Sequence, residues 1–240
     1  MAVMQLARSD GGDVVAEPEL YAALLALDDA DIVELGCGTG VHTRAIASGG
    51  RNRRVTAFEV DRVQLERNQA DAPANVEFRY GGAEAIDRPA ACADVVFMFK
   101  SLHHVPLAAM DTALDEVARI LRPGGRAWIS EPVFAGAFND IIRRFHDEQA
   151  VRQAAFDAVA RAVTRGVLEL EREIFFRNPV HFTSFADFES RIINATHSEH
   201  RLDELTLARV KADFEAHLGA DGAHFQAPMR VDLLRRPAAG

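Results

Sequence analysis

Hydrophobic residues between positions 31 and 130 follow two alternating patterns. Short apolar runs are typical of β-strands, and the unbroken run at 93–99 indicates a strand covered on both faces. Between the runs, apolar residues recur at helical spacing, most clearly at 111–121. Alternating strands and helices predict right-handed crossovers and a parallel sheet. The expected strands are 31–35, 54–60, 75–80, 93–99 and 125–130.

The two ends of the chain follow other patterns. Residues 17–27 predict a helix that enters the fold, and after residue 132 the strand–helix alternation stops. Apolar residues at helical spacing then predict an insertion of amphipathic helices. Towards the C-terminus we expect an aromatic-rich loop at 174–185, helices at 185–194 and around 207–218, a weak strand at 196–202 and a strand at 227–237.

Length and composition are those of a folded protein. The 240 residues suffice for one α/β domain spanning 1–240 with an insertion, and 48% are apolar. The 27 basic and 36 acidic residues give a net charge of −9. An acidic chain repels a phosphate backbone, so we expect no nucleic-acid partner.

Cysteine content and hydropathy bear on compartment and metal. Cys37 and Cys92 alone cannot form a metal cluster or a disulfide framework, so neither is expected. No basic segment followed by an apolar one marks a signal peptide at the N-terminus. No apolar run approaches the ~20 residues that span a bilayer. These features predict a cytoplasmic protein without a membrane partner.

A glycine-rich turn, ELGCGTG at 34–40, follows the first predicted strand. Gly36, Gly38 and Gly40 stand at every second position before a helical pattern, where open α/β sheets bind ligands. A phosphate-binding P-loop would need a lysine, which is absent. A dinucleotide fingerprint would need glycine at position 41, which is Val41.

Together with four later segments, this turn resembles the motifs of class I S-adenosylmethionine-dependent methyltransferases. The resemblance covers roughly residues 20–132 in the correct order. It implies a doubly wound, Rossmann-like α/β fold with a seven-stranded sheet, mostly parallel with an antiparallel last strand. It also implies S-adenosyl-L-methionine as cofactor. The later segments are TAFEVD at 56–61, YGGAEAI at 80–86, FKSLHHV at 99–105 and LRPGGRAWISE at 121–131.

The resemblance also implies cofactor-binding residues. Glu59 stands where the family has the acidic residue that accepts both ribose hydroxyls, and Glu34 stands near the methionine ammonium. Gly82 replaces an aspartate that usually holds the adenine amino group, which leaves the backbone of Ala83 and the side chain of Glu84 for that role. The full set is Glu34, Gly36, Gly38, Gly40, Glu59, Val60, Ala83, Glu84 and Lys100, the last through its backbone.

Candidates for acceptor binding or proton removal are Glu131, His103 and His104, which follow neighbouring strands at one sheet edge. A general base is needed only for an acceptor that is protonated at neutral pH. One histidine of such a pair is usually structural, and Glu131 could instead cap a helix or pair with an arginine. Asp147 and Glu148 are expected on a solvated face, although a cationic acceptor would suit them.

The insertion at about 134–180 is long enough to form a helical lid over the cofactor. A lid and a negative charge favour a small-molecule acceptor, methylated by in-line transfer. A nicotinamide-dependent oxidoreductase is the first alternative, disfavoured by Val41 and by the lack of a Tyr-x-x-x-Lys pair. A non-catalytic cofactor-binding protein is the second, favoured only by Gly82. The acceptor atom stays open, as does the choice between monomer and homodimer.

Overall fold

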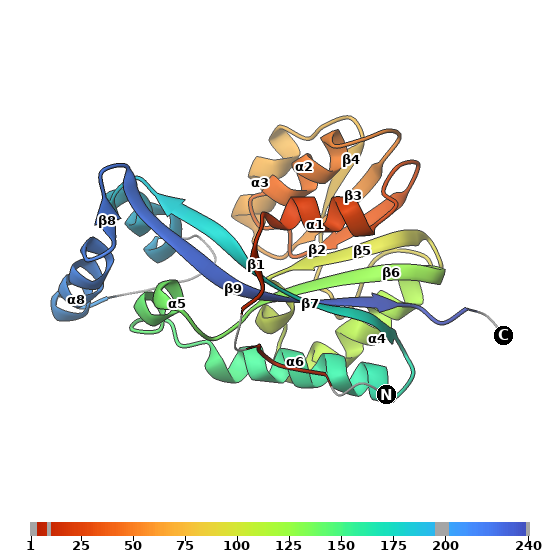
Figure 1. Ribbon diagram of the computed structural model, residues 1–240. Helices are drawn as coiled ribbons and strands as arrows, with labels where there is room; N and C mark the ends of the chain where they lie inside the picture. Colours follow the sequence, from red (N-terminus) through yellow and green to blue (C-terminus); the bar gives the residue numbers. More distant parts are fainter. Residues whose placement is uncertain (1–3, 9–10, 195–201, 239–240) are drawn as a thin grey trace.

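The computed structural model describes residues 4–8, 11–194 and 202–238. Nine strands form one sheet in the described part of the chain (Figure 1). They are β1 (Asp13–Val14), β2 (Asp31–Leu35), β3 (Arg54–Glu59), β4 (Val76–Tyr80), β5 (Ala93–Phe99), β6 (Leu121–Pro132), β7 (Glu169–Phe182), β8 (Leu218–Gly219) and β9 (Gly222–Arg235).

Helices connect these strands. The α-helices are α1 (Glu17–Leu24), α2 (Val41–Ser48), α3 (Arg62–Ala70), α4 (Met110–Ile120), α5 (Ala137–Ile142), α6 (Gln149–Thr164), α7 (Phe185–Phe188) and α8 (Glu204–Glu215). Shorter turns of other helix types are η1 (Leu102–His104), η2 (Leu107–Ala109) and the π-helical η3 (Glu189–Ile193).

The strand order is β1-β7-β9-β6-β5-β2-β3-β4, with β8 paired to β9. Strands β2 to β6 are parallel, and β9 runs antiparallel to both of its neighbours, β6 and β7. The expected mostly parallel sheet with an antiparallel last strand is therefore confirmed. The count differs from seven because the two-residue strands β1 and β8 are added.

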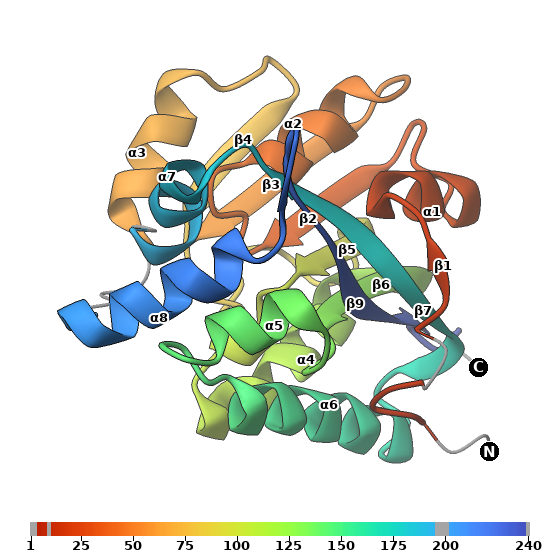
Figure 2. The same cartoon turned by 60° about the vertical axis from the view of Figure 1, so that its left-hand side comes forward.

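Helices cover both faces of the sheet (Figures 1 and 2). On one face, buried residues of α1, α2 and α3 pack against alternate strand positions such as Val55 and Trp128. On the other, α4 and α6 pack together against positions such as Val96 and Ile129. The unbroken apolar run of β5 follows from this arrangement, since both faces of the strand are buried.

Two predictions for the C-terminal half are corrected. The segment 174–185, predicted as a loop, belongs largely to β7, which pairs with β9 from Glu169↔Arg235 to Phe182↔Ala223. The helical part of the segment 134–180 ends at Thr164, because the chain then turns into β7. Its longer helix, α6, packs on α4 as part of the main body. The weak strand prediction at 196–202 lies almost entirely outside the described residues.

A third hydrophobic cluster lies beyond the main body, where β7 and β9 extend past the rest of the sheet (left in Figure 1). We call this part the cap; it is built from α5, α7, η3, α8 and the adjoining ends of β7 and β9. Half of its core residues are phenylalanines. The cap core residues are Ile141, Phe182, Phe188, Ile193, Val210, Phe214, Ala223 and Phe225.

Candidate active site

The predicted site residues lie at one edge of the sheet, where β2 to β6 end; we call it the carboxyl edge. The glycine turn follows β2, Glu59 ends β3, and Gly82 follows β4. Lys100 and both histidines follow β5, and Glu131 is the second-to-last residue of β6. In open α/β sheets this edge binds the ligand, at the point where the strand order reverses. Here the order reverses between β2 and β5.

The three glycines of the turn meet different surroundings. A Cβ on Gly36 would lie 2.7 Å from Ser101 Cβ, and one on Gly40 would lie 2.9 Å from Asn68 Oδ1. A Cβ on Gly38 would meet nothing within 4 Å, and its φ of 53° is in the left-handed region. A side chain at position 36 or 40 would therefore collide with protein atoms, whereas the space beside Gly38 is open to a ligand. Gly36 is itself exposed, so a ligand can also reach its backbone.

Glu59 holds the glycine turn in place. Its side chain is buried, and Oε2 accepts the Gly38 N–H at 2.6 Å. Its Oε1 accepts the N–H groups of Val60 and Asp61, each at 2.8 Å. From the other side, the Asn68 amide donates to the Gly38 carbonyl at 2.8 Å. Three of about four acceptor positions on the carboxylate are thus filled, which leaves about one for a ribose hydroxyl.

Glu34 lies deeper than its predicted role near an ammonium group suggests. It is 1% exposed, and Oε2 accepts a hydrogen bond from the Thr43 hydroxyl at 2.6 Å. Burial raises the pKa of Glu34 to about 8, with a further contribution from the charge of Glu59. A cation bound at the turn would act in the opposite direction and favour the ionised carboxylate.

The adenine end of the predicted cofactor site has exposed apolar side chains and a displaced carboxylate. Val60 is 59% exposed and Tyr80 52%, at the ends of the paired strands β3 and β4. Ala83 is buried in the core, so only its backbone can face a ligand. A Cβ on Gly82 would collide with the carboxylate of Glu84. The Glu84 carboxylate therefore lies where an aspartate side chain at position 82 would start.

Lys100 marks the end of β5. Its φ of 54° is left-handed, which is unusual for a residue with a side chain, and its N–H donates to the Ser130 carbonyl at 2.7 Å. The side chain is exposed. The left-handed turn directs the following residues, Ser101 to His104, across the carboxyl edge.

The two histidines after β5 have different environments. His103 is 4% exposed, and its Nδ1 is hydrogen-bonded to Oε2 of the equally buried Glu131. Oε1 of Glu131 accepts the N–H groups of Leu102 at 3.0 Å and His103 at 3.3 Å. His104 is exposed, with its ring centroid 4.1 Å from that of His103. Glu131 therefore caps the first two N–H groups of the short turn η1 and fixes the His103 ring. Among the described residues it forms no ion pair with an arginine.

Glu148 is a partner of His103 that the sequence did not indicate. We expected it on a solvated face, but it is 8% exposed, and its Oε1 lies 3.4 Å from His103 Nε2. Arg152 binds the other oxygen at 2.7 Å and also donates to Asn139 Oδ1 at 2.9 Å. Glu148 directly precedes α6 and lies 45 positions from His103, so no local pattern connects the two.

The two carboxylates set the charge of His103. Burial by itself would lower the pKa of the ring, but the negative charges of Glu131 and Glu148 outweigh burial and raise it to about 9. Burial likewise acts to raise the pKa of Glu148, and the neighbouring His103 and Arg152 reverse this and hold it below the usual range. At neutral pH the cluster therefore contains a His103 cation beside a Glu148 anion.

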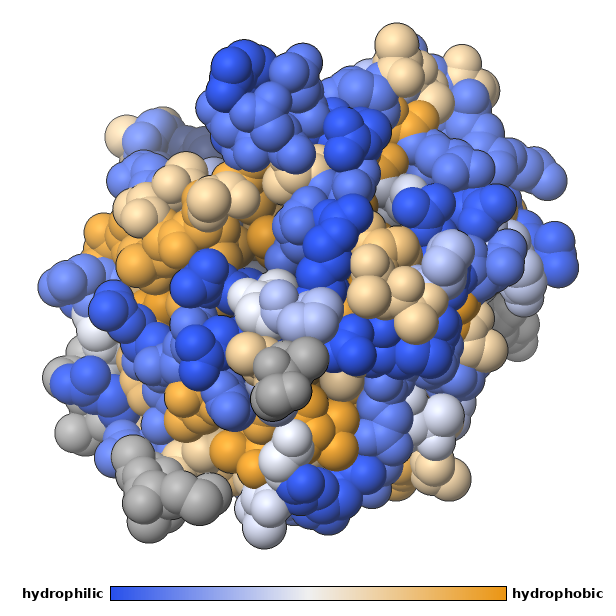
Figure 3. All heavy atoms as spheres, turned by 90° about the vertical axis from the view of Figure 1, so that its right-hand side faces the viewer, coloured by the Kyte–Doolittle hydropathy of each residue, from blue (hydrophilic) through white to orange (hydrophobic). Residues whose placement is uncertain are grey.

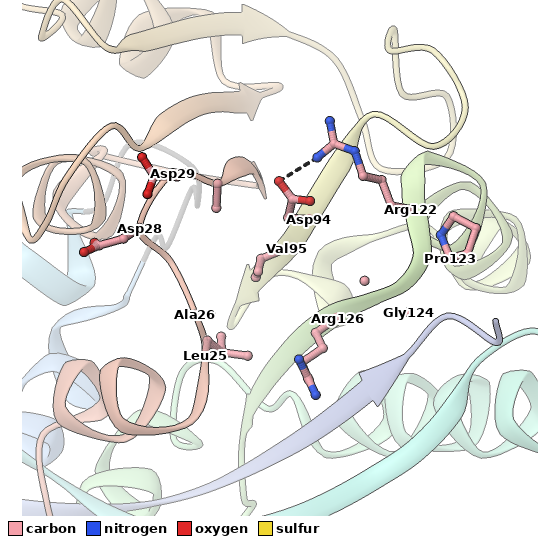
Figure 4. Close-up of a pocket in the computed structure, with 12 residues that line it drawn as sticks. Leu25, Ala26, Asp28, Asp29, Asp94, Val95, Arg122, Pro123, Gly124 and Arg126 are labelled. Carbon is pink, nitrogen blue, oxygen red and sulfur yellow. Dashed lines mark ion pairs between the residues drawn. The ribbon is translucent and has the colours of Figure 1, made fainter.

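A pocket of about 410 Å³ lies at the opposite end of the strands, lined by residues before β2 and by the first residues of β5 and β6 (Figure 4). There Asp94 points to Arg122, which also binds Asp31. Because this pocket is remote from the carboxyl edge, we assign it no part in cofactor binding.

The side of the molecule with the chain ends has a mostly hydrophilic surface with separate hydrophobic areas (Figure 3).

Comparison with known proteins identifies the family. Residues 32–125, which contain the glycine turn, Glu59 and the histidine pair, match the family model of a methyltransferase domain. The 27-O-demethylrifamycin SV methyltransferase of Amycolatopsis mediterranei is 34% identical over 111 residues, or 44% of this chain and 40% of that protein. These similarities confirm the resemblance to S-adenosylmethionine-dependent methyltransferases that the sequence motifs indicate.

Other similarities extend further along the chain. The O-methyltransferase resE of Aspergillus sclerotiorum is 31% identical over 176 residues, or 70% of this chain and 62% of that protein. The chain thus spans less than two thirds of both relatives. The solved structure of the [4+2]-cyclase SpnF has a TM-score of 0.59 at 19% identity, covering 92% of this chain and 80% of that one. That similarity concerns the fold.

No helix in the described part of the chain combines the length and the apolar character needed to cross a membrane. Both cysteines are free thiols, and Cys37 is buried. Burial raises the pKa of the Cys37 thiol well above its usual range, so Cys37 stays protonated and is a packing residue.

Proposed function

We propose that this protein transfers the methyl group of S-adenosylmethionine to a hydroxyl oxygen of a small-molecule acceptor. The open space at Gly38, beside Glu59 at the carboxyl edge, carries the cofactor part of the proposal. Bound there, S-adenosylmethionine supplies an electrophilic methyl group on a positively charged sulfur. Oxygen as the acceptor atom is supported by the names of several relatives, among them the O-methyltransferases resE and rstn1.

The residues around the turn suit the parts of this cofactor. The remaining acceptor position of Glu59 suits a ribose hydroxyl. Val60 and Tyr80 offer apolar surface for the adenine ring, and the Glu84 carboxylate can accept from its amino group. A cation nearby would favour the ionised form of the buried Glu34 carboxyl, whose pKa burial raises to about 8. These roles are part of the proposal.

On the acceptor side, His104 is the residue that can reach a bound molecule, because it is exposed while His103 is buried. We assign His104 the removal of the hydroxyl proton at a ring nitrogen as the oxygen attacks the methyl group. His103 is a positioning residue: Glu131 and Glu148 fix its ring, against which His104 packs. Alignment and exclusion of water supply most of the rate acceleration, up to ~7–11 kcal/mol.

The proposed acceptor is a small organic molecule, and the proposed location of the protein is the cytoplasm. A net charge of −9 disfavours nucleic acid, and the cap offers an apolar neighbour for a small organic molecule. The free cysteines are consistent with a cytoplasmic, reducing location.

A non-methylating activity is the second candidate, because a [4+2]-cyclase shares this fold. One experiment separates the two. The protein is incubated with methyl-labelled S-adenosylmethionine and a panel of phenols, enols and alcohols, with amines and thiols in parallel. We expect label transfer to a hydroxyl compound and stoichiometric S-adenosylhomocysteine.

Calorimetry with S-adenosylhomocysteine tests the cofactor part separately. Glu59→Gln should weaken binding by about 10–100-fold, since a charged acceptor is lost. NADH should not bind, and Asp87→Asn, which changes an exposed carboxylate, should leave the affinity unchanged. Wild-type affinity in Glu59→Gln would refute the assigned site. Tight binding without label transfer to any compound would favour the second candidate.

A further inference from the structure

A group of metal-ligand side chains lies beside the acceptor region. His103, His104 and Glu148 each offer one ligand atom, and these three atoms lie within 4.8 Å of one another. They come from η1 and from the residue that precedes α6. No metal was expected from the sequence, because the two cysteines alone cannot form a cluster and because positions 103 and 148 lie far apart along the chain.

The distance between two of the ligand atoms matches that of metal-bound atoms. Nδ1 of His103 is occupied by Glu131, so Nε2 is the ring nitrogen that faces Glu148, and it lies 3.4 Å from Oε1. Two atoms bound tetrahedrally to zinc at ~2.1 Å are about 3.4 Å apart. This pair therefore needs almost no movement to share one ion, and metal binding displaces the proton that His103 carries on Nε2 at neutral pH.

The side chains that would hold the metal ligands in position are also present. Histidines that bind metals usually donate their other ring nitrogen to a carboxylate, and Glu131 takes that position, itself held by two backbone N–H groups. Arg152 binds Oε2 of Glu148 and so leaves Oε1 directed at His103. The ligand rings and the carboxylate are thus oriented in advance.

The same residues show how an ion could enter the site and which existing contact it would replace. His104 is exposed, so an ion can enter from solvent and keep an open coordination position on that side. His146 Nε2 lies 2.8 Å from Oε1 of Glu148. An ion at this oxygen would replace that contact or recruit His146 as a fourth ligand.

We propose that His103 Nε2, His104 and Glu148 Oε1 form a binding site for one divalent transition-metal ion, with Glu131 as the supporting carboxylate. Two imidazoles and one carboxylate suit Zn²⁺, Co²⁺ or Ni²⁺, whereas Mg²⁺ and Ca²⁺ prefer all-oxygen sites. A metal bound here occupies His104, so it inhibits methyl transfer; this last consequence alone rests on the proposed function.

Titration of chelator-treated protein with ZnCl₂, without cofactor or acceptor, tests the site by calorimetry. A second histidine pair, His181 and His224, stacks near Asp221 and could bind zinc adventitiously. All titrations therefore use the His181→Ala/His224→Ala background. We expect one zinc per chain and no heat with MgCl₂. CoCl₂ should give the strong visible bands of a four-coordinate site.

His104→Ala is the decisive variant, because an exposed side chain can be removed with the fold intact. It should weaken zinc binding at least about tenfold, and Glu148→Gln should do the same. Melting curves without metal verify that both variants are folded. Unchanged affinity in folded His104→Ala, or absence of a one-to-one zinc site in the background protein, would overturn the proposal. Methylation assays with and without zinc are read separately and do not affect this result.

Discussion

Glu34 is a carboxylate that reduces stability at neutral and alkaline pH. Burial raises its pKa from 4.5 to about 8, so between these values the folded state binds a proton that the unfolded state has released. Stability must then fall as pH rises through this range. Glu34→Gln should abolish that fall and raise the free energy of unfolding above pH 8 by a few kcal/mol, at ~1.4 kcal/mol per pKa unit. Urea unfolding at pH 5, 7 and 9 measures it.

Glu34→Gln should also weaken cofactor binding if Glu34 lies near a positively charged group of the cofactor. We expect weaker affinity for S-adenosylhomocysteine in the more stable protein, a trade-off known from other functional sites. Glu66→Gln, on an exposed position of α3, is the control and should change neither quantity. A pH profile of Glu34→Gln that parallels wild type would show that Glu34 is not the titrating group.

Gly82 and Glu84 allow a test by exchange. Because the Glu84 carboxylate lies over Gly82, Glu84→Ala should weaken S-adenosylhomocysteine binding by about 10–100-fold, the loss of one charged hydrogen bond. Gly82→Asp alone should also bind poorly, because its Cβ collides with Glu84. The double variant Gly82→Asp/Glu84→Ala should recover most of the affinity in calorimetry. Failure of the double variant to recover would argue against a carboxylate at this place.

The sequence indicated that the glycine turn is a ligand site, but it did not show why each glycine is needed. The three glycines look alike in the sequence, but in the structure a side chain at Gly36 or Gly40 would meet protein atoms and one at Gly38 would not. Ser101 and Asn68 cause that packing from positions far along the chain. Burial of Glu34 was likewise hidden, since an acidic residue at a strand end reads as exposed.

At the scale of elements, the contact of α6 with the histidine region depends on Arg152. Its side chain is 11% exposed and pairs with the almost equally buried Glu148. Arg152→Met leaves that carboxylate without one partner and should lower the free energy of unfolding by ~3 kcal/mol. Arg161→Met on the same helix breaks a half-exposed pair with Asp111 and should cost less than ~1 kcal/mol. Equal losses in urea unfolding would mean that His103 and His146 suffice to stabilise Glu148.

The parallel half of the sheet was predictable because its strands are buried on both faces and stand out as apolar runs. β7 was not, since most of its positions are exposed or half-exposed and it contains Pro179. Its strand conformation is imposed by β9, which pairs with it along its length. Glu148 was mistaken for a solvated residue because its burial depends on His103, which belongs to another element.

At the scale of the whole molecule, the cap has a hydrophobic core of its own. Phe214 of α8 is fully buried there among Phe182, Phe188 and Phe225. Phe214→Ala should destabilise the protein by ~3–5 kcal/mol, while Leu205→Ala on the exposed side of α8 should cost less than ~0.5 kcal/mol. Thermal melting gives both values.

Because no residue of the glycine turn belongs to the cap core, Phe214→Ala should keep wild-type affinity for S-adenosylhomocysteine. Methyl transfer to the acceptor should fall, since the cap is the apolar neighbour that we propose for it. A parallel loss of cofactor affinity would show that the cap and the cofactor site act as one unit.

The position of β9 has a consequence for the order of assembly during synthesis. β9 lies between β6 and β7, and it completes both the main sheet and the cap core. Until residues 222–235 have left the ribosome, β7 has no neighbour through which to join the sheet, so β1, β7 and the cap helices have no template. The N-terminal part through β6 can gather earlier. A nascent chain stalled before β9 should therefore expose the aromatic residues of the cap, and this unfinished chain is the form that chaperones would meet.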